Sequence, residues 1–120
     1  MKALDEVFGL LDRERRRFAL YYLREVDEPV TVEELAEQIA AWETNTAPAD
    51  VPDSAFDDVT LTLRHHHLPK AAEVEFVEYD REANVVRLSG TPAEFGVVLS
   101  VAKAIERPAS DSIVGLGELV

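Results

Sequence analysis

Cysteine is absent from the 120-residue sequence. Disulfide bonds, thiolate metal sites and cysteine nucleophiles are therefore excluded. The sequence also has no apolar run near the roughly 20 residues that a membrane-spanning helix requires. No basic segment followed by an apolar stretch marks a secretory signal. We therefore expect a cytoplasmic protein without a membrane partner.

Lysine is scarce. Only Lys2, Lys70 and Lys103 accompany nine arginines, and the twelve bases face 24 acids, which gives a formal net charge of −12. This charge repels phosphate at long range and by itself argues against a nucleic-acid partner. An acidic, lysine-poor composition is also typical of proteins from salt-loaded cytoplasms, where the Debye length at 1 M salt is about 3 Å. We favour the halophilic interpretation, under which the net charge says little about DNA.

Hydrophobic residues make up 47% of the chain, enough for a folded core. The length corresponds to one domain, which we place at residues 1–107, followed by a tail at 108–120. Apolar residues at helical spacing predict helices at 3–11, 13–25, 32–43 and 54–67. Asp12 is the expected cap of the second helix, Thr31 with Glu34 forms a capping box for the third, and Asp53 or Ser54 should cap the fourth.

The segment after the fourth helix predicts a β-hairpin. Pro69 should end or kink the 54–67 helix at Leu68. Two short strands, 76–79 and 85–88, follow around a polar turn, and Val30 is expected to add a strand of one or two residues. A helix–turn–helix pattern that leads into a hairpin predicts an α+β, mainly α fold: a winged helix-turn-helix with a two-stranded wing. The loop at 44–53 is longer than the turn of a minimal helix–turn–helix.

A last helix is predicted at 92–107, opened by a capping box at Thr91. Its sequence is apolar nearly all round, which is typical of a helix buried on more than one face. We therefore expect this helix to form a homodimer, with a contribution from the first helix. The predicted interface residues are Phe95, Val98, Leu99, Ala102 and Ile105.

Several short motifs, in order, resemble the haloarchaeal winged helix-turn-helix domains of unknown specific function, which lie near the ArsR-type regulators in fold. The motifs are residues 13–18 with 20–23, 34–36, 41–43, 67–70 and 77–80. The resemblance covers roughly residues 4–90 and implies a winged helix with a role in transcriptional regulation. The chain departs from that pattern at Glu75 and Phe76, where the family usually has glycine before the first wing strand, and at Arg64–His66.

An arginine cluster opens the second helix. Arg13, Arg16 and Arg17 share one helix face and could clamp phosphates beside a recognition helix. Intramolecular pairing with the surplus acids explains the cluster equally well, so both interpretations stay open.

The 54–67 helix is the candidate recognition helix. Arg64 could bind guanine in a major groove, with His65, Thr60 and Thr62 beside it. Asp57 and Asp58 oppose this interpretation because the first residues of a recognition helix approach DNA. Arg81, at the wing tip, is the candidate wing contact, although acids surround it.

The triple histidine at 65–67 cannot converge on one metal ion, because adjacent helical residues diverge by about 100°. His67 is instead expected to be partly buried. No motif indicates an active site or a cofactor, so we do not expect an enzyme. The sequence predicts a homodimeric regulator that binds double-stranded DNA at Arg13, Arg16, Arg17, Thr60, Thr62, Arg64, His65 and Arg81. The alternative is a winged-helix adaptor that binds proteins and not DNA.

Overall fold

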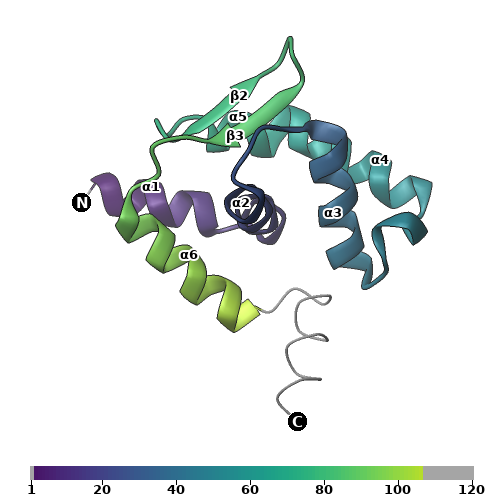
Figure 1. Cartoon of the computed structure of the whole chain (residues 1–120), viewed down its shortest axis with the longest axis horizontal. Helices are drawn as coiled ribbons and strands as arrows, with labels where there is room; N and C mark the ends of the chain where they lie inside the picture. Colours follow the sequence, from purple (N-terminus) through teal and green to yellow (C-terminus); the bar gives the residue numbers. More distant parts are fainter. Residues whose placement is uncertain (1, 107–120) are drawn as a thin grey trace.

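The computed structural model describes residues 2–106, with side chains from residue 4 onward (Figure 1). The expected tail at 108–120 lies outside the described residues. The elements in chain order are α1 (Lys2–Leu11), α2 (Glu14–Val26), β1 (Val30–Thr31), α3 (Val32–Thr44), a 3-10 turn (Pro48–Asp50), α4 (Asp53–Thr62), a π-helical turn (Leu63–His67), α5 (Leu68–Ala71), β2 (Val77–Asp80), β3 (Val85–Leu88) and α6 (Ala93–Glu106).

The fold is α+β and mainly helical, with one small antiparallel sheet of order β1-β3-β2. β2 and β3 form a hairpin in which Tyr79 lies opposite Val86. β1 pairs with the other edge of β3, where Val30 lies opposite Val86. The short strand that precedes α3 therefore fixes the hairpin to the helical part of the molecule.

Helix α2 lies at the centre of the molecule and is seen end-on in Figure 1, with α1, α3, α6 and the sheet around it. Its buried face packs mainly on α3. Phe18 meets Trp42 edge to face at 5.6 Å between ring centroids, and Tyr22 meets the same indole at 6.4 Å. This aromatic cluster joins the two helices across their contact.

The predicted helices at 3–11, 13–25 and 32–43 are confirmed within one residue, and so are the short strand at Val30 and the strand at 85–88. Thr31 caps α3 by accepting a hydrogen bond from the Glu34 backbone N–H at 3.1 Å. The carboxylate of Glu34 does not complete a capping box in the expected way. It accepts a hydrogen bond from the Tyr22 hydroxyl at 2.6 Å instead.

Two of the predicted caps are wrong. The residue before α2 is Arg13, and its side chain caps nothing, while Asp12 forms an ion pair with Arg16 one turn later. The residue before α4 is Pro52, so neither Asp53 nor Ser54 caps that helix. Asp12 lies one residue before the N-cap position of α2, and Asp53 lies one residue after that of α4. Neither side chain therefore caps the first free backbone N–H groups of its helix.

The 54–67 helix was predicted to end or kink at Leu68, and it does not end there, because the helical path continues through Pro69 to Ala71. The turn ahead of the proline is π-helical, and the Leu68 N–H donates to the Leu63 carbonyl five residues back. Pro69 then lies in the first turn of α5, where its missing N–H is tolerated. A wider turn thus replaces the expected break.

The first wing strand is one residue later than predicted, at Val77–Asp80. Neither Glu75 nor Phe76 has a positive φ, so this turn does not need the glycine that it lacks. The hairpin turn ends at Asn84, whose φ of 61° is a conformation that asparagine tolerates better than most residues. The wing therefore depends on Asn84 and not on its first turn for its geometry.

Candidate functional site

Arg16 is buried, which corrects the prediction that it contacts phosphate. Its guanidinium donates to the backbone carbonyls of Leu10 and Gly9 at 3.0 and 2.7 Å and to Asp12 at 2.6 Å. A fourth contact, at 3.2 Å, joins it to Nδ1 of His67. Burial, opposed by Asp12, lowers the pKa of Arg16 from its ordinary value. Arg16 closes the end of α1 onto α2 and is not part of an exposed surface.

Arg17 faces α6. Its Nε and Nη2 donate to the two carboxylate oxygens of Glu106 at 2.9 and 2.8 Å, and the Tyr21 hydroxyl donates to the same carboxylate at 2.8 Å. The hydrogen bond with Glu106 raises the pKa of Arg17, although partial burial opposes it. Arg17, a predicted phosphate contact, therefore links α2 to the last turn of α6.

Arg15, which the sequence did not single out, is the member of the cluster that faces α4. It binds the Glu43 carboxylate through two nitrogens at 2.7 Å and reaches Asp58 at 3.0 Å and the Thr62 hydroxyl at 2.8 Å. The hydrogen bond to Glu43, opposed by burial, raises the pKa of Arg15. Its partners lie 28 to 47 residues away, so helix periodicity could not reveal them.

The outward face of α4 is acidic and apolar. Asp57, Asp58 and Leu61 are exposed on it, and His65 follows in the π-helical turn. Leu61 is 57% exposed. The hydroxyls of Thr60 and Thr62 donate to backbone carbonyls of their own helix. Of the predicted recognition residues in this stretch, His65 is the one with an exposed side chain and no partner within the described residues.

Arg64 connects the helix to the wing. Its Nη2 donates to the Glu33 carboxylate and, at 3.0 Å, to Oδ1 of Asn84. Asn84 donates to Glu33 in turn. Burial of the carboxylate raises the pKa of Glu33. Hydrogen bonds from the Glu33 backbone, Asn84 and Arg64 outweigh this effect and hold the pKa below its ordinary value. This triad joins the first turn of α3, the π-helical turn and the hairpin.

Arg13 and Arg81 complete the predicted set, and both are exposed. Arg13 is 3.9 Å from Asp12, while the Arg81 guanidinium lies 5.9 Å from the ring centroid of Tyr79. Two of the predicted arginines, Arg17 and Arg64, each hold a carboxylate, as their neighbour Arg15 does. Arg13, His65 and Arg81 are the members of the set that remain accessible for a new contact.

His67 is buried, as predicted, and its ring points to Arg16. Because an arginine donates in every protonation state, Nδ1 of His67 accepts and the ring is neutral. Burial, with His66 and Arg16 adding to it, lowers the pKa of His67 to about 4. His65 and His66 are exposed, and within residues 2–106 no three histidine or acidic side chains are grouped so that they could hold a metal ion.

Two residues of the predicted dimer interface, Phe95 and Leu99, are not on the surface of the chain. Phe95 and Leu99 are buried in the chain's own core against the sheet and α2, because this face of α6 covers the core. Val98 and Ile105 are exposed, and Ala102 lies at the boundary. The outer face of α6 includes two residues that the prediction omitted, Val97 and Val101, which are 64% and 54% exposed. The helix is apolar on both faces, and Phe95 and Leu99 face the core while Val97 and Val101 face outward.

These observations define a small α+β domain in which acids neutralise most of the basic side chains. The chain belongs to the family described as Domain of unknown function (DUF7344), whose model matches residues 8–87, about two thirds of the sequence. The match ends before α6 and begins within α1. Neither the curated proteins nor the solved structures contain a match to this chain. None of the helices in residues 2–106 has the length and apolar character needed to cross a bilayer.

Proposed function

We propose that this chain is a winged helix-turn-helix protein that binds double-stranded DNA as a homodimer and regulates transcription in a cytoplasm rich in salt. The observation that carries the proposal is the topology. A helix, a short strand, two helices and a hairpin follow one another, and the first strand pairs with the second strand of the hairpin in the order β1-β3-β2. In winged helices this arrangement presents the second helix of the pair, here α4 with its extension, to a major groove.

The ion pairs at the proposed DNA face are compatible with this function at high salt. Arg64 and Arg15 are partly exposed, and each can exchange its carboxylate for a phosphate oxygen with little net change in hydrogen bonding. The long-range repulsion from the net charge is screened within about 3 Å at 1 M salt. Binding then depends on short-range contacts, for which Arg13, His65 and Arg81 are already accessible.

The test is selection of genomic DNA fragments in molar KCl, followed by affinity measurements on an enriched fragment. We expect Arg64→Ala to weaken binding by about tenfold or more, because a guanidinium contact to a base is worth about 1–3 kcal/mol. Arg87→Ala is the matched control, since Arg87 is also a surface arginine with one carboxylate partner, Glu78, on the hairpin. If no sequence is enriched at any salt concentration, DNA binding is ruled out.

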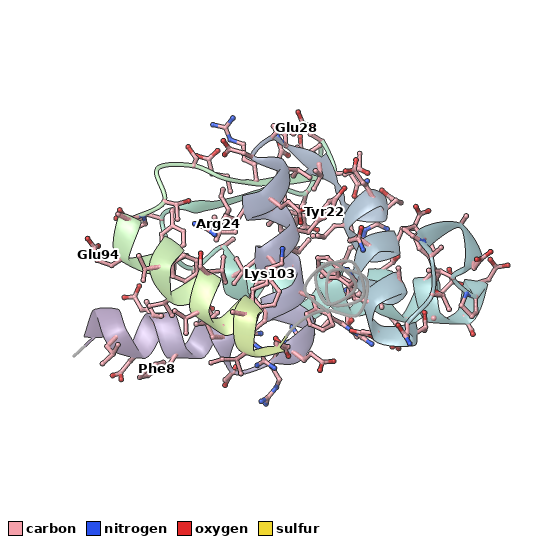
Figure 2. All side chains as sticks on the ribbon, turned by 60° about the horizontal axis from the view of Figure 1, so that its bottom comes forward. Phe8, Tyr22, Arg24, Glu28, Glu94 and Lys103 are labelled. Atoms are coloured by element: carbon pink, nitrogen blue, oxygen red, sulfur yellow. The ribbon has the colours of Figure 1, made fainter. Side chains whose placement is uncertain are left out.

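The second copy in the proposed dimer would cover the apolar face of α1 and α6. Among the described residues, all the exposed large hydrophobic side chains except Leu61 belong to these two helices: Leu4, Phe8, Val97, Val98, Val101 and Ile105. The two helices lie on the same side of the molecule, with Phe8 pointing outward (Figure 2). In a chain with a net charge of −12, an apolar face is where two copies can approach with less repulsion than over the acidic remainder of the surface.

Sedimentation tests this interface directly. Val101→Glu should convert a dimer into a monomer, because Val101 is exposed and the new carboxylate would be buried without a partner. Leu61→Glu is the control, since it places the same charge on an exposed apolar position of α4. A monomeric wild type, or a dimeric Val101→Glu variant, would contradict the proposed interface.

A second function, protein binding without DNA, is favoured by the outward face of α4. Leu61 is surrounded there by Asp57 and Asp58, and a surface of this kind suits a partner with basic and apolar side chains. The two functions differ in their response to Leu61→Glu. An adaptor would lose its partner, whereas a DNA-binding protein would lose affinity for every sequence through the added negative charge.

A further inference from the structure

Arg24 differs from most basic residues because no described residue gives it an acidic partner. Among the Lys and Arg side chains that the structure describes, all except Arg24 and Arg81 lie within ion-pairing distance of a carboxylate. Arg81 lies over Tyr79 on the exposed hairpin. Arg24 lies in a groove, where one hydrogen bond of 2.7 Å from Nη1 to the Ser100 hydroxyl holds it.

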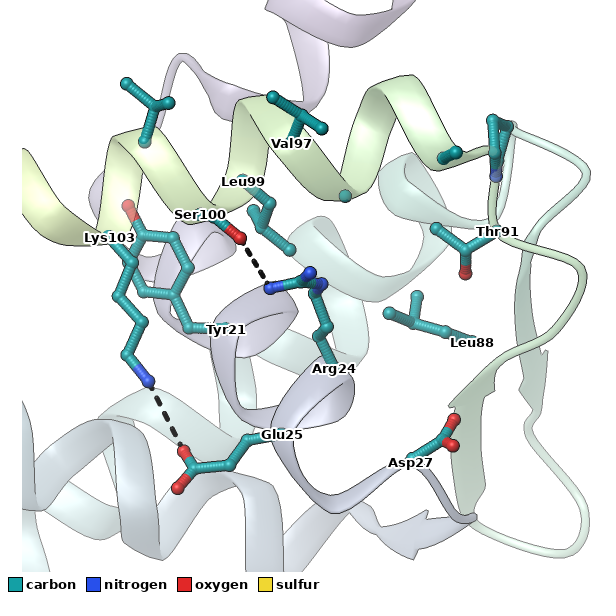
Figure 3. A pocket seen from close by; sticks show the side chains of 14 residues that line it. Tyr21, Arg24, Glu25, Asp27, Leu88, Thr91, Val97, Leu99, Ser100 and Lys103 are labelled. Carbon is teal, nitrogen blue, oxygen red and sulfur yellow. Dashed lines mark hydrogen bonds and ion pairs between the residues drawn. The ribbon is translucent and has the colours of Figure 1, made fainter.

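The groove lies between α2, the end of β3 and α6, and has a volume of about 880 Å³. Figure 3 shows the Arg24 side chain rising from α2 to the underside of α6, with Leu88 and Thr91 on one side of it. On the other side lies an ion pair of 3.5 Å between Lys103 and Glu25. The guanidinium therefore occupies the middle of the groove, between polar and apolar walls.

The absence of a side chain at Gly96 leaves space for the Arg24 guanidinium beside α6. A Cβ at this position would lie 3.5 Å from Nη2 and 3.6 Å from Nε of Arg24, so the planar group packs directly on the helix. Any side chain longer than alanine would push it away. The nitrogens that do not bind Ser100 keep their donor capacity.

We propose that this groove binds a small organic carboxylate with an apolar body, anchored by Arg24. The carboxylate would accept hydrogen bonds from the Arg24 fork and from the hydroxyls of Ser100 and Thr91. The apolar body would lie along Leu88, Val97 and Pro92. A volume in the range of small-molecule sites accommodates such a compound.

The charges around the groove select a singly charged ligand. Glu25 and Asp27 line it together with Arg24 and Lys103, so two acids balance two bases. Glu25 is held by Lys103, which leaves Arg24 as the cation available to a ligand. A phosphate with nearly two negative charges exceeds the charge of the one guanidinium that no described carboxylate pairs with, whereas a carboxylate matches that single charge.

A ligand in this groove would bridge α2 and α6. Val97 and Val101 line the groove and also belong to the exposed apolar face of α6. Binding would therefore fix α6 against the body of the domain and adjust the dimer, which would make the ligand an effector. This regulatory role rests on the proposed function, but the binding site itself does not.

The experiment is a nuclear magnetic resonance titration of the labelled protein at constant KCl with sodium 4-phenylbutyrate. We expect saturable shifts of the Arg24 Nε–H and of the Gly96 and Ser100 amides. The neutral 4-phenylbutan-1-ol and inorganic phosphate should each bind at least about tenfold more weakly, because the alcohol lacks the carboxylate and phosphate lacks the apolar body. Equal binding of either compound, or no saturable shift with 4-phenylbutyrate, would overturn the proposal.

Matched variants complete the test. Arg24→Gln should weaken 4-phenylbutyrate binding by about tenfold or more. Arg81→Gln removes the other described arginine that has no described acidic partner, and it should leave binding unchanged. Arg24→Lys keeps the charge but loses the planar fork and should bind with intermediate affinity. Unaltered binding by Arg24→Gln would overturn the assignment. The titration needs neither DNA nor a dimer, so its result is independent of the proposed regulatory function.

Discussion

Arg17 binds both carboxylate oxygens of Glu106, at 2.9 and 2.8 Å, across 89 residues of sequence. This bidentate pair is partly buried, with side-chain exposures of 24% and 18%, and joins the central helix to the last turn of α6. Other polar contacts between α6 and α2 include those of Tyr21 with Glu106, Arg24 with Ser100 and Lys103 with Glu25. The sequence left DNA contact and pairing with an acid of the same chain both open for Arg17, and the structure shows the pairing.

The Arg17–Glu106 pair should show a measurable coupling energy. We expect Arg17→Ala and Glu106→Ala each to reduce the free energy of unfolding by about 1–3 kcal/mol, since each leaves a partly buried charge without its partner. In a double-mutant cycle by urea denaturation, the two changes should deviate from additivity by at least about 0.5 kcal/mol. The exposed pair Arg87–Glu78 is the control and should couple more weakly. Additive effects at Arg17 and Glu106 would show that the pair does not hold α6.

His67 should make the protein less stable in acid. Its pKa is about 4 in the folded protein and near 6.5 when unfolded, so only the unfolded chain takes up a proton as the pH falls through this interval. Stability from this residue is complete above pH 6.5 and should fall by about 2 kcal/mol between pH 7 and pH 5. His67→Gln, which retains an acceptor for Arg16, should remove that part of the acid loss. Denaturation at the two pH values measures it, with the exposed His65→Gln as the control; equal losses in His67→Gln and wild type would contradict the assignment.

Replacing Arg16 with lysine should reduce the stability of the protein. The guanidinium satisfies two backbone carbonyls, Asp12 and His67 from one planar group, whereas an ammonium has three donors and a different shape. At least one buried acceptor would lose its donor, so Arg16→Lys should cost about 1–3 kcal/mol of stability. Thermal unfolding checks this, with the exposed Arg13→Lys as the matched control. A variant as stable as wild type would show that charge alone suffices at this position.

Gly96→Ala should stabilise the domain. The added Cβ would be in ordinary contact with the Arg24 guanidinium at 3.5 Å, and alanine in a helix interior is favoured over glycine by about 0.5–1 kcal/mol. Chemical denaturation should show an increase of this size. Gly96→Leu, by contrast, should displace the guanidinium and decrease stability. A loss of stability in Gly96→Ala would mean that the groove cannot accept even a methyl group.

The helices and strands could be read from the sequence because each depends on local features. The apolar spacing of Leu4 to Leu11, the Thr31 cap and the alternation around Val86 are all local signals. The arginine contacts could not be read in the same way. Arg15, Arg16 and Arg17 are consecutive, and each faces a different part of the molecule, so only the packing of α1, α4 and α6 around α2 assigns their partners. Helix α6 shows the same limit, because a helix that is apolar on all sides does not reveal which side is covered.

The number of residues in the π-helical turn at Leu63–His67 is linked to the proline that follows it. Such a turn holds one residue more than the α-helical path it replaces, as a single-residue insertion would produce. Removing one histidine from the triplet would restore α-helical spacing and place the ring of Pro69 against a carbonyl of the preceding turn. Across the family, relatives one residue shorter in this stretch should therefore lack the proline as well. The three histidines would then mark the place where the lineage of this chain gained a residue.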